Sequence, residues 1–175
     1  MISIIVGTNR RNSKSKEVAL FYQKLLNNLN VENQILDLAE LPKDFISSAL
    51  YENNGKNEDF NTAFRQQMKA SDKYVFIVPE YNGSFPGVLK VFIDGLGYPS
   101  ELLHKKAALV GISDGVQGST LALSHLTDIF NYLGLNMLAQ RVKIPFMKKN
   151  FLEGQITDVL INQLITEQAA LLVKF

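Results

Sequence analysis

Short apolar runs alternate along the chain with longer segments in which apolar residues recur every three or four positions. The runs are short and most are rich in Val, Ile and Leu, which is typical of strands buried on both faces of a parallel sheet. Runs predicted as strands stand at residues 2–6, 34–38, 74–78, 107–112 and 136–142. Because strand-like and helix-like segments alternate, the pattern predicts an α/β fold.

The segments between these runs predict amphipathic helices after Ser15, at 62–70, from Pro86, after Ser119 and near the C-terminus. Pro86 suits the first position of a helix, because the missing N–H would find no partner there. The chain shows no repeat, low-complexity tract or linker, so we expect residues 1–175 to form a single domain. Helices on both faces of the sheet predict a three-layer α/β/α sandwich with five parallel strands in the flavodoxin-like order 2-1-3-4-5.

A long connection is predicted at 42–59, which contains Asn53-Asn-Gly-Lys-Asn and has room for one short helical turn. Four aromatic residues bracket it, namely Phe45, Tyr51, Phe60 and Phe64. They either fold the connection onto the core or form a lid or a subunit contact. The sequence favours none of these alternatives.

The charge balance argues against polyanionic partners. Lys and Arg total 18 against 17 Asp and Glu, so we expect neither nucleic acid nor a membrane as partner. The chain has no cysteine, so redox chemistry requires a bound cofactor. The two histidines have no carboxylate pair nearby, and no metal site is expected. The first residues contain no basic leader, and we expect a cytoplasmic protein.

Three loops rich in small or polar residues follow the first, third and fourth predicted strands, at 7–15, 79–85 and 113–119. We call them the first, second and third loops. Doubly wound sheets bind ligands outside the carboxyl ends of their strands, near the point where the strand order reverses. These loops therefore predict the position of a ligand site.

The first loop, Gly7-Thr-Asn-Arg-Arg-Asn-Ser-Lys-Ser, places hydroxyls, amides and arginines between a strand and the start of a helix. A phosphate there would meet free N–H groups, the positive end of the helix dipole and a guanidinium. The alternative is a solvated turn in which Ser13 or Ser15 only caps the helix. The chain has neither a Walker A motif nor G-x-G-x-x-G, which favours a cofactor with a single phosphate.

The second loop, Pro79-Glu-Tyr-Asn-Gly-Ser-Phe-Pro-Gly, contains an Asn-Gly pair that favours a tight turn with positive φ. Such a turn can leave backbone N–H groups free for a ligand. Tyr81 offers an aromatic wall for that ligand, or simply packs on the surface of the turn.

The second loop, continued by Pro86-Gly-Val-Leu-Lys and Ile93-Asp, closely resembles the signature of the NAD(P)H-dependent FMN reductase family. That flavodoxin-like family includes quinone, azo-dye and chromate reductases. Gly7-Thr-x-Arg-x-x-Ser-x-Ser resembles its phosphate loop, and Ser113-x-Gly-x-x-Gly resembles its third loop. The likeness extends over most of the chain.

The resemblance implies three groups of FMN contacts. The phosphate would be held by Thr8, Arg10, Ser13 and Ser15. The isoalloxazine would be lined by Pro79, Glu80, Tyr81, Asn82 and Gly83, with backbone N–H groups facing its polar edge. Ser113 and Gly115 would border the ring from the other side. Ser15 stands where the family more often has Asn, so that one amide donor is lost.

The resemblance also implies an enzyme that transfers hydride from NADPH or NADH to bound FMN and then reduces a quinone, azo compound, free flavin or similar small molecule. No catalytic side chain is assigned, because the flavin supplies the reactive atoms. Family members are commonly homodimers or homotetramers. The alternatives are a non-enzymatic electron carrier of flavodoxin type and a flavin-free binding module. The balanced charge argues against the carrier, which usually docks through an acidic face.

Overall fold

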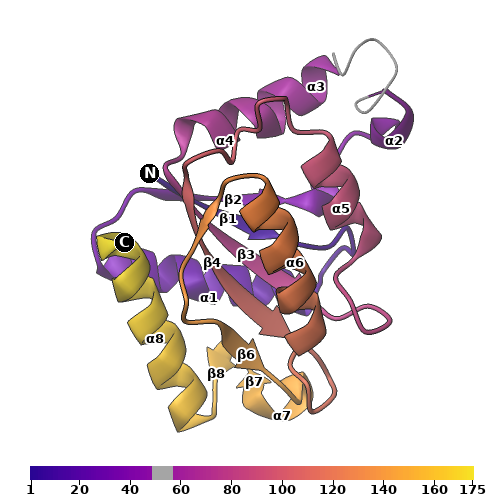
Figure 1. The fold of residues 1–175 in the computed structure, drawn as a ribbon. Helices are drawn as coiled ribbons and strands as arrows, with labels where there is room; N and C mark the ends of the chain where they lie inside the picture. The colour runs from indigo at the N-terminus through magenta and orange to yellow at the C-terminus, as the bar shows by residue number, and fades with distance from the viewer. Residues whose placement is uncertain (49–56) are drawn as a thin grey trace.

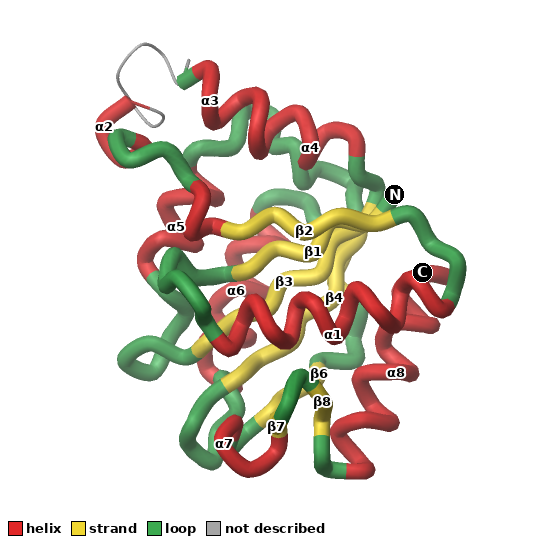
Figure 2. The backbone as a smooth tube through the Cα atoms, turned by 180° about the vertical axis from the view of Figure 1, so that it is seen from behind, coloured by secondary structure: helices red, strands yellow, loops and turns green. Residues whose placement is uncertain are grey.

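The computed structural model describes residues 1–48 and 57–175. Its centre is a parallel sheet that contains β1 (Ile2–Val6), β2 (Asn33–Asp37), β3 (Lys73–Pro79), β4 (Lys106–Ile112), β5 (Asn136–Met137) and β6 (Val142–Ile144). The strand order is β2-β1-β3-β4-β5, and β6 also pairs with β4. Helices cover both faces (Figures 1 and 2). The predicted α/β sandwich and its strand order 2-1-3-4-5 are therefore confirmed.

The fifth strand differs from the continuous run predicted at 136–142. It consists of two short pieces, β5 and β6, which pair with the two ends of β4. Between them the amide Nε2 of Gln168 donates to the carbonyl of Leu109 at 3.0 Å and to that of Gln140 at 2.8 Å. The chain leaves the sheet here because a side chain from a helix supplies the hydrogen bond that a strand would otherwise make.

The helices lie close to their predicted positions. On one face are α1 (Lys14–Asn28) and α8 (Val159–Lys174). On the other are α5 (Gly87–Asp94), α6 (Thr120–Tyr132) and the segment formed by α3 (Glu58–Phe60), a π-helical turn η3 (Asn61–Arg65) and α4 (Gln66–Ala70). Pro86 is the N-cap of α5, so the helix begins one residue later than predicted. The helix expected at 62–70 begins earlier, after Asn57 caps its first turn.

Several short elements accompany the sheet, and all but one were absent from the sequence prediction. A 3₁₀ turn, η1 (Leu38–Glu40), follows β2. The helix α2 (Phe45–Ser48) lies in the connection predicted at 42–59, for which a short helical turn was expected. After β6, α7 (Met147–Asn150) leads into an antiparallel pair, β7 (Phe151–Leu152) and β8 (Gln155–Ile156). Elements of two to four residues are too short to show an apolar period. These segments matter because α7 reaches the ligand edge of the sheet.

The core is divided between the two faces of the sheet. Apolar side chains of β1, β3 and β4 alternate between a cluster under α1 and α8 and a cluster under α5 and α6. Phe45, Phe60 and Phe64 are buried in the second cluster, and the ring centroids of Phe45 and Phe60 are 4.5 Å apart. These aromatic residues therefore fold the long connection onto the core, whereas Tyr51 lies outside the described residues.

Candidate functional site

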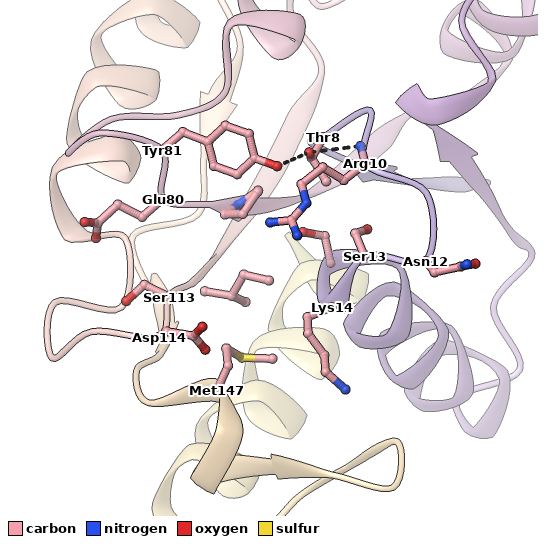
Figure 3. A pocket seen from close by; sticks show the side chains of 13 residues that line it. Thr8, Arg10, Asn12, Ser13, Lys14, Glu80, Tyr81, Ser113, Asp114 and Met147 are labelled. Carbon is pink, nitrogen blue, oxygen red and sulfur yellow. Dashed lines mark hydrogen bonds between the residues drawn. The ribbon is translucent and has the colours of Figure 1, made fainter.

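A cavity of about 240 Å³ lies at the carboxyl ends of β1, β3 and β4, where the three predicted loops meet (Figure 3). Its lining residues are Thr8, Arg10, Asn12, Ser13, Lys14, Ser15, Pro79, Glu80, Tyr81, Ile112, Ser113, Asp114 and Met147. The strands hold these loops together, because β1 pairs with β3 along the whole of β1, and β3 pairs with β4 along the whole of both strands. The sheet thus joins three segments that are far apart in sequence.

The first loop presents a set of unused donors to this cavity. Ser13 is the N-cap of α1, and its Oγ accepts a hydrogen bond from the N–H of Lys16 at 3.2 Å. The N–H groups of Ser13, Lys14 and Ser15 donate to no acceptor in the described part of the chain. Ser15 is 1% exposed, and its hydroxyl likewise has no partner among the described residues. This arrangement suits an anion at the positive end of α1.

Two cations beside the first loop line the cavity, and one of them has no ion pair in the described residues. Lys14 Nζ pairs with Glu17 at 2.8 Å. Lys16 Nζ lies 3.0 Å from Asp37, whose hydrogen bond and negative charge raise the pKa of Lys16. Arg10 has no ion-pair partner in residues 1–48 and 57–175, and its guanidinium points into the cavity (Figure 3). Arg10 is therefore available to an anionic ligand.

The second loop is closed by a two-residue turn. Asn82 and Gly83 have φ values of 51° and 75°, and the backbones of Tyr81 and Ser84 exchange hydrogen bonds of 2.7 and 3.0 Å. Positive φ at both central positions is the geometry that Asn-Gly favours. The N–H of Glu80 donates to the carbonyl of Ile112 at 3.0 Å. The N–H groups of Glu80 and Tyr81 are thus used within the protein.

Tyr81 connects the second loop to the first. Its hydroxyl lies 2.7 Å from Oγ1 of Thr8, which also accepts a hydrogen bond of 3.3 Å from the N–H of Arg10. Thr8 is 1% exposed, whereas Tyr81 is half-buried. Tyr81 also borders a second cavity of about 540 Å³, lined mainly by apolar residues such as Leu38, Pro86 and Val88. The ring stands between the two cavities.

The third loop is organised by Ser113. Its Oγ donates to the carbonyl of Gly115 and accepts from the N–H of Gly118, both at 3.0 Å. The carbonyl of Gly115 also accepts from the N–H of Phe146, and the carbonyl of Ser113 accepts from the N–H of Met147. These bonds hold the start of α7 against the loop, which is why Met147 reaches the cavity.

Most of the predicted site residues meet around this cavity. It contains Thr8, Arg10, Ser13, Ser15, Pro79, Glu80, Tyr81 and Ser113. Asn82, Gly83 and Gly115 do not line it. The cavity is also lined by five residues that were not predicted from the sequence, namely Asn12, Lys14, Ile112, Asp114 and Met147. Four of these flank predicted site residues in the chain, but nothing in the sequence relates Met147 to the other loops.

Several polar side chains lie outside this cavity. Lys90 pairs with Asp94 of its own helix at 2.7 Å. His125 is exposed on α6, where Nδ1 lies 2.9 Å from Oγ of Ser84. The described ranges contain no cluster of three or more metal-ligating His, Asp or Glu side chains. Within the same ranges, no helix is long and apolar enough to cross a membrane.

Comparisons with solved structures show the fold. The flavoenzyme NAD(P)H:(acceptor) oxidoreductase FerB from Paracoccus denitrificans superposes with a TM-score of 0.80 and 24% identity, covering 99% of this chain and 94% of its own. A flavodoxin of Streptococcus pneumonia superposes with a TM-score of 0.63 and 12% identity, covering 99% and 96%. An oxidoreductase and a flavodoxin therefore share this architecture, and the fold alone does not distinguish them.

Sequence comparisons find relatives with higher identity to this chain. A 2-hydroxy-1,4-benzoquinone reductase of Burkholderia sp is 31% identical over 144 residues, covering 79% of this chain and 74% of the relative. An NAD(P)H-dependent FMN reductase of Pseudomonas aeruginosa is 36% identical over 109 residues, covering 60% of this chain and 59% of the relative. The sequence profile of the NADPH-dependent FMN reductases matches residues 1–148, which include all three loops. The chain belongs to the NADPH-dependent FMN reductase family.

Proposed function

We propose that this protein is an FMN-dependent NAD(P)H oxidoreductase that reduces a quinone, an azo compound or a similar small molecule. The observation that carries the proposal is the meeting of the three family loops around one cavity. Family membership makes FMN the cofactor and a reduced nicotinamide nucleotide the electron donor. The residues of the three loops suit different parts of FMN.

The first loop fits the phosphate of FMN. The buried Ser15 hydroxyl and the N–H groups at the start of α1 lack acceptors among the described residues, and phosphate oxygens would supply them. Arg10 adds a charge-assisted hydrogen bond. We assign phosphate binding to Thr8, Arg10, Ser13 and Ser15. The Ser13 cap does not prevent this, because its hydroxyl proton stays available while its oxygen accepts from Lys16.

The second and third loops suit the isoalloxazine. We assign its lining to Pro79, Glu80 and Tyr81 on one side and to Ser113 on the other. When bound, FMN supplies hydride acceptance from the nicotinamide and electron delivery to the acceptor. The protein holds the ring, closes one side of the cavity with Tyr81 and keeps the third loop in place through Ser113. Asn82, Gly83 and Gly115 would contact the ring only at the rim, since they lie outside the cavity lining.

The acceptor class is supported by the relatives. Besides the benzoquinone reductase, an NADPH azoreductase of Bacillus sp. is 30% identical over 127 residues, covering 70% of this chain and 64% of the relative. Quinones and azo compounds are planar and electron-poor, so that they can stack on a flat cofactor. We assign no catalytic side chain, because proton transfer in such reductions can use water.

We further propose that the protein is a homodimer or homotetramer in the cytoplasm. Tyr98 and Tyr132 are 102% and 90% exposed beside the groove between α5 and α6. Exposed aromatic residues next to an apolar groove are typical of an interface between protein chains. Sedimentation of the purified protein tests the oligomeric state, and a monomer at micromolar concentration would refute this part of the proposal.

The function is tested by recording the visible spectrum of the purified protein with and without added FMN, followed by anaerobic addition of NADPH or NADH. We expect flavin absorption bands that bleach within seconds and recover on addition of a benzoquinone. Bound FMN that stays oxidised with both nucleotides would favour the electron carrier. Protein that takes up no FMN would refute both functions and favour the flavin-free module.

A further inference from the structure

We infer that the Tyr81 hydroxyl is a positioning group for the phosphate end of FMN, acting through Thr8, and that it helps the protein to distinguish FMN from riboflavin. The inference rests on the proposed FMN site and adds to it. The family resemblance places Tyr81 at the isoalloxazine, at the opposite end of the cofactor. The hydrogen bond from Tyr81 to the first loop assigns its hydroxyl a second role.

The hydroxyl of Thr8 can form a limited number of hydrogen bonds. A threonine hydroxyl has one proton to donate and two lone pairs that accept. The N–H of Arg10 occupies one lone pair of Thr8 Oγ1 at 3.3 Å. The Tyr81 hydroxyl, at 2.7 Å, either donates to the other lone pair or accepts the Thr8 proton.

An anion in the first loop selects between these two arrangements. If Tyr81 accepts the Thr8 proton, Thr8 has no proton left for a phosphate oxygen. If Tyr81 donates, both lone pairs of the Thr8 oxygen are occupied. The Thr8 proton is then free to be donated to a different acceptor. Thr8 is 1% exposed and lines the cavity, so the phosphate is the acceptor available to it. A hydrogen bond from Thr8 to the phosphate therefore requires Tyr81 to donate to Thr8.

The chain of bonds also makes each donor stronger. A hydroxyl that accepts a hydrogen bond becomes polarised and donates more strongly. In the arrangement that the phosphate selects, the hydrogen bond from Tyr81 thus holds the Thr8 proton toward the phosphate oxygen. Riboflavin has the same ring and no phosphate, so it cannot benefit from this arrangement.

Tyr81→Phe removes the hydroxyl and keeps the ring. We expect the dissociation constant of FMN to rise about three- to tenfold, the effect of one neutral hydrogen bond. The dissociation constant of riboflavin should change less than about twofold. Both are measured on the apo-protein by quenching of flavin fluorescence. Tyr132→Phe is the matched control, because it removes an exposed hydroxyl from α6, and both constants should stay unchanged.

A double-mutant cycle tests whether the effect passes through Thr8. In a Thr8→Val background, adding Tyr81→Phe should leave the FMN dissociation constant unchanged, because Thr8 no longer has a proton to orient. In a Thr8→Ser background, which keeps the hydroxyl, Tyr81→Phe should again weaken FMN. This second result separates loss of the relay from a general disturbance of the loop.

Three results would overturn the inference while leaving the proposed function intact. They are unchanged FMN affinity in Tyr81→Phe, equal weakening of FMN and riboflavin, and full additivity with Thr8→Val. A wild-type protein that binds neither flavin would instead refute the proposed function, and the inference with it.

Discussion

Arg10→Ala removes the cation that the cavity leaves without an ion-pair partner in the described residues. Because no ion pair within the protein is broken, the substitution should change cofactor binding and leave folding stability almost unaffected. A charge-assisted hydrogen bond contributes about 1.5–3 kcal/mol, which corresponds to roughly ten- to a hundredfold in affinity. Arg10 is exposed, so that water and salt screen it, and we expect a loss near tenfold at physiological salt.

The remaining donors explain why the loss is partial. The N–H groups at the start of α1 and the Ser15 hydroxyl stay in place, and they contribute hydrogen bonds that salt screens less than an exposed charge. Arg10→Lys keeps the charge and loses the planar fork, so its FMN affinity should lie between those of the wild type and Arg10→Ala.

Titration of the apo-protein with FMN at low and high salt separates charge from shape. The wild-type affinity should fall more steeply between 0.1 and 1 M salt (roughly, Debye lengths of 10 and 3 Å) than that of Arg10→Ala. Arg141→Ala is the matched control, because Arg141 is an exposed arginine that lines a different cavity. Equal FMN affinity and equal salt dependence in the wild type and Arg10→Ala would refute the phosphate assignment.

Four predictions concern stability and are checked by urea unfolding. Tyr22→Phe should be neutral or raise the unfolding free energy by about 1 kcal/mol, because the buried Tyr22 hydroxyl has no described partner. Tyr74→Phe should lower the unfolding free energy by about 1–2 kcal/mol, since the Tyr74 hydroxyl donates to the carbonyl of Met68 at 2.6 Å. A loss of stability in both tyrosine variants, or a gain in both, would contradict this reasoning. Burial raises the pKa of both phenols above the ordinary value of 10. The unfolded chain therefore loses these protons first, and the free energy of unfolding should fall as the pH rises above 10. An unfolding free energy that stays constant from about pH 9 to 12 would refute this prediction. Arg65→Met should lower the unfolding free energy by about 3 kcal/mol, because the Glu101 carboxylate, which is 2% exposed, loses the cation that lies 2.7 Å away. A loss below about 0.5 kcal/mol would show that stability does not depend on this ion pair.

The central strands and the long helices could be predicted because their patterns are strong. The runs that became β1, β3 and β4 are apolar apart from Ser3, as is typical of strands buried on both faces. The split of the fifth strand could not be predicted in this way. It depends on a hydrogen bond from Gln168, which reaches the sheet from a helix that follows much later in the chain.

The candidate site was predictable to the extent that it is local. The loops after β1, β3 and β4 carry their own turn and capping residues, and the parallel sheet brings them to one edge. Met147 was missed because its position depends on backbone hydrogen bonds between α7 and the third loop. Asn82 and Gly83 were expected at the ring, but a closed turn keeps them outside the cavity lining.

The Gln168 hydrogen bonds show that the folded unit extends beyond the segment that the family profile matches. The family profile ends at residue 148, whereas α8 covers one face of the sheet with Ile165, Ala169 and Leu172. A protein truncated at residue 148 would expose that face to water and leave the Leu109 carbonyl without its amide partner. The C-terminal helix thus completes the structure on which the three loops depend, and a shortened protein made for crystallisation or engineering should retain it.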